Sequence, residues 1–323
     1  MSSLFKLTFV FLLINHSLWA QDLAPAVTPV EEHGQLSIQN GKILNERSQP
    51  VQLKGMSLFW SQWQPQFYNE ETVKNLAETW NTEIIRAAMA IEHGGYLEEP
   101  EKEMAKVKTV IDAAIGLGIY VIVDWHDHHA EDHLEEAKQF FEEIAETYKD
   151  VPNIIYEPYN EPLDVSWDNV LKPYHEQIIT TIRQQDKDNI IVVGTPNWSQ
   201  RVDLAAMNPI DGDNIAYTLH FYAGTHGQEL REKAEVAIEK GLALFVTEYG
   251  TTNADGDGPV HKEATAEWYE FMDHHKLSWC NWSIAAKDES SAALVPGTAP
   301  QDLNKEEHIT PSGKLVRSQL LKE

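Results

Sequence analysis

Cysteine is almost absent from this sequence, since Cys280 is the only one among 323 residues. A single thiol excludes an intrachain disulfide and a cysteine-based metal site. Basic residues are also few: 25 Lys and Arg stand against 51 Asp and Glu, which gives a net charge of -26. Long-range repulsion from this charge argues against nucleic acid and anionic membrane surfaces as partners. The composition therefore favours a neutral or cationic ligand.

Long apolar runs are missing after the N-terminal segment, so the sequence predicts no transmembrane anchor. The N-terminus has the pattern of a signal peptide: Lys6, an apolar run over residues 7–14, and the small residue Ala20 before a polar pair. We expect a signal peptide over residues 1–20, cleaved after Ala20, and therefore a secreted or periplasmic protein. Residues 21–32, with their prolines and acidic residues, are predicted to form a short extended tail.

Residues 33–323 show no break in composition and are predicted to form one domain. Two short alternating runs flank Asn40-Gly41, which predicts a β-hairpin ahead of the main fold, acting as a cap. After it, β-rich runs alternate with helical segments, the first of them over residues 70–80 with Asn69 as N-cap. We expect strands over residues 51–56, 83–88, 119–124, 153–159, 189–194, 215–221, 243–248 and 277–283.

The segments between these strands carry apolar residues at helical spacing, which predicts helices packed on the outside of a sheet. Eight strand and helix units of this length predict an α/β fold, a (β/α)8 TIM barrel with an N-terminal β-hairpin cap. A doubly wound open sheet is the structural alternative. The two folds differ in whether the first and last strands pair.

Polar and aromatic side chains collect at the ends of the predicted strands, where a barrel places its working groups. Any one of them alone is best interpreted as a polar residue at the barrel rim. Together they indicate an active site. The set comprises Arg86, His126, Asn160, Glu161, Trp198, His220, Tyr222, Glu248 and Trp282.

Two of these residues, Glu161 and Glu248, are carboxylates at the ends of the fourth and seventh predicted strands. A facing pair suits cleavage of an acetal, because one carboxyl protonates the leaving oxygen while the other meets the developing oxocarbenium centre. A separation of about 5 Å would mean direct attack and retention of configuration, whereas roughly 6.5–9.5 Å would admit a water and mean inversion. The sequence leaves this distance open.

The neighbouring residues indicate how the two roles divide. Arg86 and Tyr222 would keep a nearby carboxylate ionised, while the other glutamate should hold its proton to higher pH. Aromatic residues at the same end of the barrel, Trp60, Trp63, Trp198 and Trp282, offer flat apolar faces. Such faces beside hydrogen-bonding groups fit a sugar.

A metal site is the rival interpretation. His126 and His128 form an H-x-H pair just after a predicted strand, and His220 could join them with the carboxylates as further ligands. A divalent ion would then activate water. The supply of ligands on other strands is thin, so we expect no metal and no cofactor.

Several motifs occur together: GKILNERSQPVQLKGMS, Arg86, DWH at 124–126, YNEP at 159–162, HFY at 220–222, TEYG at 247–250 and WS-x-x-x-KDESSAAL from Trp282. Together they resemble family 5 of the glycoside hydrolases, and in particular its bacterial endo-β-1,4-glucanases. The resemblance covers nearly the whole chain from about His33. It implies a (β/α)8 barrel that hydrolyses internal β-1,4-glucosidic bonds with retention and without a metal.

The resemblance also implies roles for individual residues. Glu161 would be the acid/base and Glu248 the nucleophile, with Asn160 on the sugar 2-hydroxyl. Arg86 and Tyr222 would orient the nucleophile. The cleavage subsite would be lined by His126, His220 and the sugar platform Trp282, and neighbouring sugars would be held by Trp63, Trp198, Lys287 and Glu289.

Two departures from many relatives concern substrate preference. Phe59 stands where a histidine is common, and Ala90 stands where a tyrosine is common. A β-mannanase, xylanase or mixed-linkage glucanase is therefore the alternative within the class, and a non-catalytic glycan-binding barrel is an alternative outside it. We expect a monomer that acts on β-1,4-glucan polysaccharide or oligosaccharide.

Overall fold

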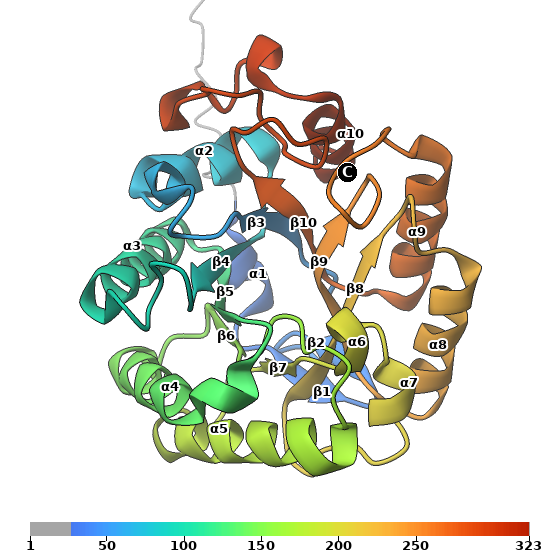
Figure 1. Ribbon diagram of the computed structural model, residues 1–323. Helices are drawn as coiled ribbons and strands as arrows, with labels where there is room; N and C mark the ends of the chain where they lie inside the picture. The colour runs from blue at the N-terminus through green and yellow to red at the C-terminus, as the bar shows by residue number, and fades with distance from the viewer. Residues whose placement is uncertain (1–26, 323) are drawn as a thin grey trace, which may run out of the picture.

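A closed barrel of eight parallel strands forms the centre of the molecule in the computed structural model, which describes residues 27–322 (Figure 1). The strands follow the chain order around the barrel, and the last pairs with the first, so the open-sheet alternative is wrong. Their bounds are β3 Lys54–Leu58, β4 Ile84–Ala90, β5 Tyr120–His126, β6 Ile154–Glu157, β7 Ile191–Val193, β8 Ile215–Tyr222, β9 Leu244–Gly250 and β10 Trp279–Ile284.

Each predicted strand overlaps an observed one, but the ends differ. The run over residues 153–159 predicts a longer strand than β6, which stops at Glu157. Pro158 follows directly, and proline has no N–H to continue the ladder. Glu161 therefore lies in the loop after the strand, four residues beyond its end.

Helices surround the barrel (Figure 1). The predicted helix over residues 70–80 is confirmed as α2, and the Asn69 side chain caps it by accepting from the Thr72 N–H at 2.9 Å. After β7 the expected single helix is replaced by two four-residue helices, α6 and α7. The helices are α2 Glu70–Trp80, α3 Pro100–Leu117, α4 Leu134–Tyr148, α5 Lys172–Gln185, α6 Pro196–Ser199, α7 Val202–Ala205, α8 Gln228–Glu239, α9 Lys262–His275 and α10 Pro311–Leu320.

The predicted hairpin is confirmed as β1 Ser37–Gln39 and β2 Lys42–Leu44, but the extended tail is wrong over its described part. Residues Pro29–His33 form the helix α1, because Thr28 and Glu31 make a capping box around a proline that is pre-set for the first turn. The predicted signal peptide lies outside the described residues.

The helix α1 and the hairpin lie behind the strands in Figure 1, at the amino end of the barrel. The Val30 N–H donates to the Gly118 carbonyl, and the Tyr120 hydroxyl donates to the Gly34 carbonyl at 2.7 Å. These contacts hold the cap against the strand starts. The opposite, carboxyl end of the barrel is where the polar side chains gather.

Side chains inside the barrel change from apolar to polar along each strand. Because strand side chains alternate between faces, every second residue points inward. On β4 the inward residues run from Ile84 to Arg86, and on β6 from Ile155 to Glu157. The amino half of the interior is thus an apolar plug, which includes the buried Cys280 on β10, and the carboxyl half holds the site. No helix among residues 27–322 is both long and apolar enough to cross a membrane.

Candidate active site

Arg86 is the centre of the polar half of the barrel. Its side chain is fully buried, and its Nε donates to Glu157 Oε2 at 2.7 Å while Nη1 donates to Glu248 Oε2 at 3.0 Å. Its Nη2 lies 2.9 Å from Asp124 Oδ2 and donates to Asn160 Oδ1 at 2.6 Å. One guanidinium therefore joins strands β4, β5, β6 and β9 and fixes the side chains on them. A buried charge is tolerated here because every branch of it is paired.

Glu161 and Glu248 face each other across the barrel mouth, as the sequence predicts. One carboxylate oxygen of each, with a ring nitrogen of His220, all lie within 4.8 Å of one another. Tyr222 donates its hydroxyl hydrogen to Glu248 Oε1 at 2.8 Å, and His220 Nδ1 lies 2.9 Å from Glu161 Oε1. This upper bound on the separation of the Glu161 and Glu248 oxygens fits the short class of carboxylate pairs, at about 5–5.5 Å, rather than the class at roughly 6.5–9.5 Å that leaves room for an attacking water.

The surroundings of the two carboxyls differ. Burial raises the pKa of Glu161 to about 7, against the lowering effect of nearby positive charge. Burial also raises the pKa of Glu248, and the charge of Glu161 adds to this, but Arg86 and the Tyr222 hydroxyl act in the opposite direction. Glu248 is thus the carboxyl with direct partners for its anion. Glu161 is the one that can keep its proton near neutral pH.

His126 and Trp282 form one wall of the site. The two rings stack with centroids 5.1 Å apart and planes 5° apart, and His126 Nδ1 lies 2.6 Å from Asp124 Oδ2. Trp60 meets His126 edge to face at 4.2 Å. Phe59 packs on Trp282 with centroids 5.1 Å apart, so the departure at this position forms an apolar floor beside the wall.

Two hollows open beside the carboxylate pair and share Glu161. The first holds Glu161 but not Glu248, and it is lined by Asn197, Trp198, Gln200, His220, Tyr222, His226 and Ala254. The second contains both carboxylates and is lined by Phe59, Trp60, Trp63, His126, His128, Tyr222, Asp255, Gly256, Trp282, Lys287 and Glu289. Every predicted site residue except Arg86 and Asn160 lines one of them, and these two lie beneath.

Two of the tryptophans that line the hollows are unusually exposed for their size, whereas Trp282 is buried. Trp63 is 53% exposed and Trp198 is 44% exposed. Trp198 is held by α6 with φ of 55°, a left-handed backbone conformation that is uncommon outside glycine. Lys287 lies over the Phe59 ring at 4.5 Å and pairs with Glu289 at 2.5 Å. The side chains predicted to contact neighbouring sugars therefore all reach the barrel mouth: Trp63, Trp198, Lys287 and Glu289.

Sequence reasoning missed three residues of the site: Asp124, Glu157 and Thr247. All three are fully buried, and each contacts a predicted site residue. A signal was present, since an acid or a hydroxyl stands at an inward position of an otherwise apolar strand. From the sequence alone, such a residue is interpreted as a polar residue of the barrel rim. Its partner becomes evident only in the closed barrel.

The His126 and His128 pair of the rival metal site does not join His220 and the carboxylates in a group of candidate ligands among the described residues. The predicted ligands His126 and His128 point to different partners, since His126 Nδ1 contacts Asp124 and His128 Nδ1 lies 3.1 Å from the Glu161 carbonyl oxygen. Among residues 27–322, two groups bring three candidate ligand atoms together, and neither contains His126 or His128. These groups are Glu161, His220 and Glu248, and Glu92, Asp127 and His129.

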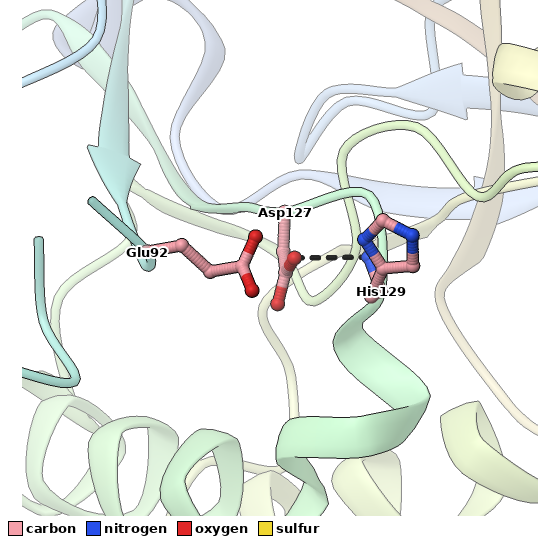
Figure 2. A group of neighbouring side chains, drawn as sticks. All are labelled: Glu92, Asp127 and His129. Atoms are coloured by element: carbon pink, nitrogen blue, oxygen red, sulfur yellow. Dashed lines mark hydrogen bonds between the residues drawn. The ribbon is translucent and has the colours of Figure 1, made fainter.

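Figure 2 shows the second group, in which the Glu92 and Asp127 carboxylates face each other and His129 extends from the following loop. The Asp127 oxygens already accept hydrogen bonds from the His129 backbone N–H at 2.9 Å and the Trp125 indole at 3.3 Å, and His133 Nδ1 lies 2.7 Å away. Asp127 therefore stabilises the loop that leads into α4.

The fold and the site together define a (β/α)8-barrel protein with a paired-carboxylate centre at the carboxyl ends of its strands. The chain belongs to the Cellulase family, glycosyl hydrolase family 5, whose model matches residues 44–288. It is 48% identical over 283 residues to Endoglucanase Z of Dickeya dadantii, an alignment that covers 86% of this chain and 65% of that protein. This chain thus spans less than two thirds of the length of that relative.

Solved structures agree with the family assignment. A structure from Cytophaga hutchinsonii is 53% identical, with a TM-score of 0.90 over 91% of this chain and 96% of that one. The catalytic domain of Thermobifida fusca endoglucanase Cel5A, solved with cellotetraose, is 34% identical, with a TM-score of 0.87 over 91% of this chain and 100% of that one.

Proposed function

We propose that this protein is a retaining endo-β-1,4-glucanase that hydrolyses internal bonds of cellulose and related soluble β-glucans. The observation that carries the proposal is the Glu161 and Glu248 pair, whose oxygens lie within 4.8 Å at the barrel mouth. That separation supports direct attack over water-mediated inversion. The endoglucanase names of the similar proteins support β-1,4-glucan as the substrate class.

The two glutamates divide the double displacement between them. Glu248 attacks the anomeric carbon while Glu161 gives its proton to the departing glycosidic oxygen. Glu161 then takes a proton from the water that releases the glycosyl group from Glu248. The raised pKa of Glu161, about 7, suits a group that must act as acid first and as base second.

The neighbouring side chains position these groups. Arg86 and Tyr222 each donate to a different oxygen of Glu248, which fixes the carboxylate plane for attack. Asn160 accepts from Arg86 through its Oδ1, which leaves its amide NH2 to donate to a sugar hydroxyl. His126 and Trp282 form the wall on which the attacked sugar would lie.

The two hollows divide the sugar chain at the cleaved bond. The hollow that contains both carboxylates would hold the attacked sugar and its neighbours, with Trp63, Lys287 and Glu289 as contacts. The hollow that contains Glu161 without Glu248 would hold the leaving group, with Trp198 as its platform. Because the site is open on both sides of the cleaved bond, a polymer can bind with sugars extending in both directions, so an internal bond can be cleaved.

The proposal includes export and a monomeric state. The first 20 residues carry the pattern of a signal peptide, which supports secretion or transfer to the periplasm. A net charge of -26 supports solubility as a monomer outside the cell. No metal or other cofactor enters the proposed reaction.

The deciding experiment records the first anomer released from cellopentaose by proton NMR. We expect the β-anomer before mutarotation, and a panel of glucan, mannan and xylan should show hydrolysis of the β-1,4-glucans foremost. Release of the α-anomer would refute the retaining mechanism. Preferential hydrolysis of mannan or xylan would refute the substrate assignment. Glu248→Gln provides the matched inactive variant, because it preserves the shape of the side chain and removes the nucleophile.

A further inference from the structure

Two buried polar groups behind the catalytic pair have no role in the steps above. Thr247 precedes Glu248 on β9, and Glu157 ends β6. Together with His220 on β8 they form a chain of hydrogen bonds that ends at Glu161. The Glu157 Oε1–Thr247 Oγ1 distance is 2.6 Å, Thr247 Oγ1–His220 Nε2 is 2.8 Å, and His220 Nδ1–Glu161 Oε1 is 2.9 Å.

The donor and acceptor of each hydrogen bond in this series follow from the charge of Glu157 at its buried end. Glu157 accepts from Arg86 Nε at 2.7 Å and from Arg86 Nη2 at 3.3 Å, so it is the carboxylate of a buried ion pair. A carboxylate can only accept, and a threonine hydroxyl has one hydrogen to donate. Thr247 therefore donates to Glu157, and its oxygen must accept from the His220 ring. The ring hydrogen lies on Nε2.

The consequence reaches the catalytic acid. Burial lowers the pKa of His220 to about 4, so the ring is neutral and has a single N–H. With that hydrogen on Nε2, Nδ1 presents a lone pair to Glu161 Oε1. An ionised carboxylate would meet this lone pair without a hydrogen between them, whereas a protonated carboxyl donates to it. The arrangement favours the protonated form of Glu161.

We propose that Thr247 and Glu157 are positioning residues that fix the tautomer of His220 and so hold the proton on Glu161. This proposal rests on the function proposed above. The proton leaves Glu161 for the glycosidic oxygen as that C–O bond breaks and Glu248 bonds to the anomeric carbon. A water later gives a proton to Glu161, and the remaining hydroxyl joins the anomeric carbon as its bond to Glu248 breaks. His220 keeps its hydrogen on Nε2 throughout. Thr247 and Glu157 touch no reacting atom.

The test variant is Thr247→Val, which removes the hydroxyl and keeps the shape. Without that acceptor the His220 ring can move its hydrogen to Nδ1 and donate to ionised Glu161, which lowers the pH at which Glu161 loses its proton. The other charged and titratable groups facing Glu161 and His220 stay in place. These are Arg86 on β4, His128 after β5, Glu157 on β6, Tyr222 on β8 and Glu248 on β9.

The measurement is the pH profile of kcat/KM for two substrates. For cellopentaose, whose leaving group needs the proton, we expect the basic limb of Thr247→Val to move down by about one pH unit, which is roughly a tenfold loss at about pH 8. For an aryl cellobioside with a highly acidic phenol as leaving group, which needs no proton, kcat/KM should be unchanged. A merely structural role for Thr247 would lower both.

Two controls bracket this variant. Thr247→Ser keeps the hydroxyl and should keep the wild-type profile. Thr218→Val is the matched control, because Thr218 is also buried, lies two residues before His220 on β8, and has a hydroxyl without a hydrogen-bond partner among the described residues. It should leave both profiles unchanged.

The proposal is overturned if the basic limb of Thr247→Val stays in place, or if both substrates lose activity equally. Failure of the proposed function would give a different result, because the wild-type protein itself would then not hydrolyse cellopentaose. If Thr247→Val does not fold, histidine-selective ¹⁵N NMR of the wild type decides, with the His220 signals assigned as those lost in His220→Gln. A neutral ring with hydrogen on Nε2 supports the proposal, and hydrogen on Nδ1 or a charged ring overturns it.

Discussion

Replacing Glu161 by glutamine should stabilise the protein at alkaline pH while it abolishes catalysis. The Glu161 side chain is only 14% exposed, and the folded state raises its pKa from 4.5 to about 7. The folded protein therefore binds this proton more tightly than the unfolded chain does. The stability that comes from this proton is complete below about pH 4.5 and is lost as the pH rises through about 7. Glutamine cannot ionise, so Glu161→Gln escapes the loss.

The size of the effect follows from the change in pKa. Raising the pKa of one carboxyl from 4.5 to about 7 costs the folded protein at most about 3 kcal/mol once the group is ionised. We expect Glu161→Gln and wild type to unfold at the same urea concentration at about pH 4. At about pH 8, Glu161→Gln should be more stable by up to that amount.

The assay is urea unfolding followed by far-UV circular dichroism across this pH range. Taking the difference between the two proteins removes the titration of groups that do not contact residue 161. Glu142→Gln on the exposed face of α4 is the control, and its difference from wild type should not change with pH. A difference for Glu161→Gln that is constant with pH, or a wild type that is the more stable at about pH 8, would refute the reasoning.

Two further predictions concern the surroundings of the pair. The lysine of Arg86→Lys cannot pair with Glu157 and Glu248 at once. We therefore expect kcat to fall by about 10²–10³ and the free energy of unfolding in urea to fall by about 3–5 kcal/mol. Wild-type values for either quantity would contradict the central role of Arg86. Trp198→Ala should raise KM for cellopentaose by roughly fivefold to tenfold and affect an aryl cellobioside less, because its leaving group is a single ring. Trp63→Ala should weaken both substrates alike. Equal effects of the two changes would contradict the assignment of the two hollows.

Most of the barrel could be predicted because its strands are buried on both faces. Runs such as residues 119–123 are continuous in apolar residues, and the amphipathic helix over residues 70–80 has a clear cap at Asn69. The helix α1 was missed because Pro25 and Pro29 in the sequence suggested an extended tail. The Thr28-x-x-Glu31 spacing of a capping box was present and was the better signal.

The candidate residues could be predicted better than the network that joins them. Glu161 and Glu248 stand out because each lies at or just beyond the end of a predicted strand, whereas Glu157 falls inside one. The partner of Glu157, Arg86, lies 71 residues away in sequence and meets it only when the barrel closes. The separation of the two carboxyls was open for the same reason, since it depends on barrel tilt and loop position rather than on local pattern.

The division of labour between the two glutamates follows from which carboxylates Arg86 reaches. Asp124, Glu157 and Glu248 each lie within 3.0 Å of its guanidinium, while no ion pair among the described residues joins it to Glu161. Arg86 is already shared among three acidic side chains, so it offers Glu161 no direct pairing to offset the cost of burying its charge. The proton therefore stays on the carboxyl that Arg86 does not reach. In the proposed mechanism, Glu161 is the acid because of its position outside this cluster, and Glu248 is the nucleophile because of its position inside it.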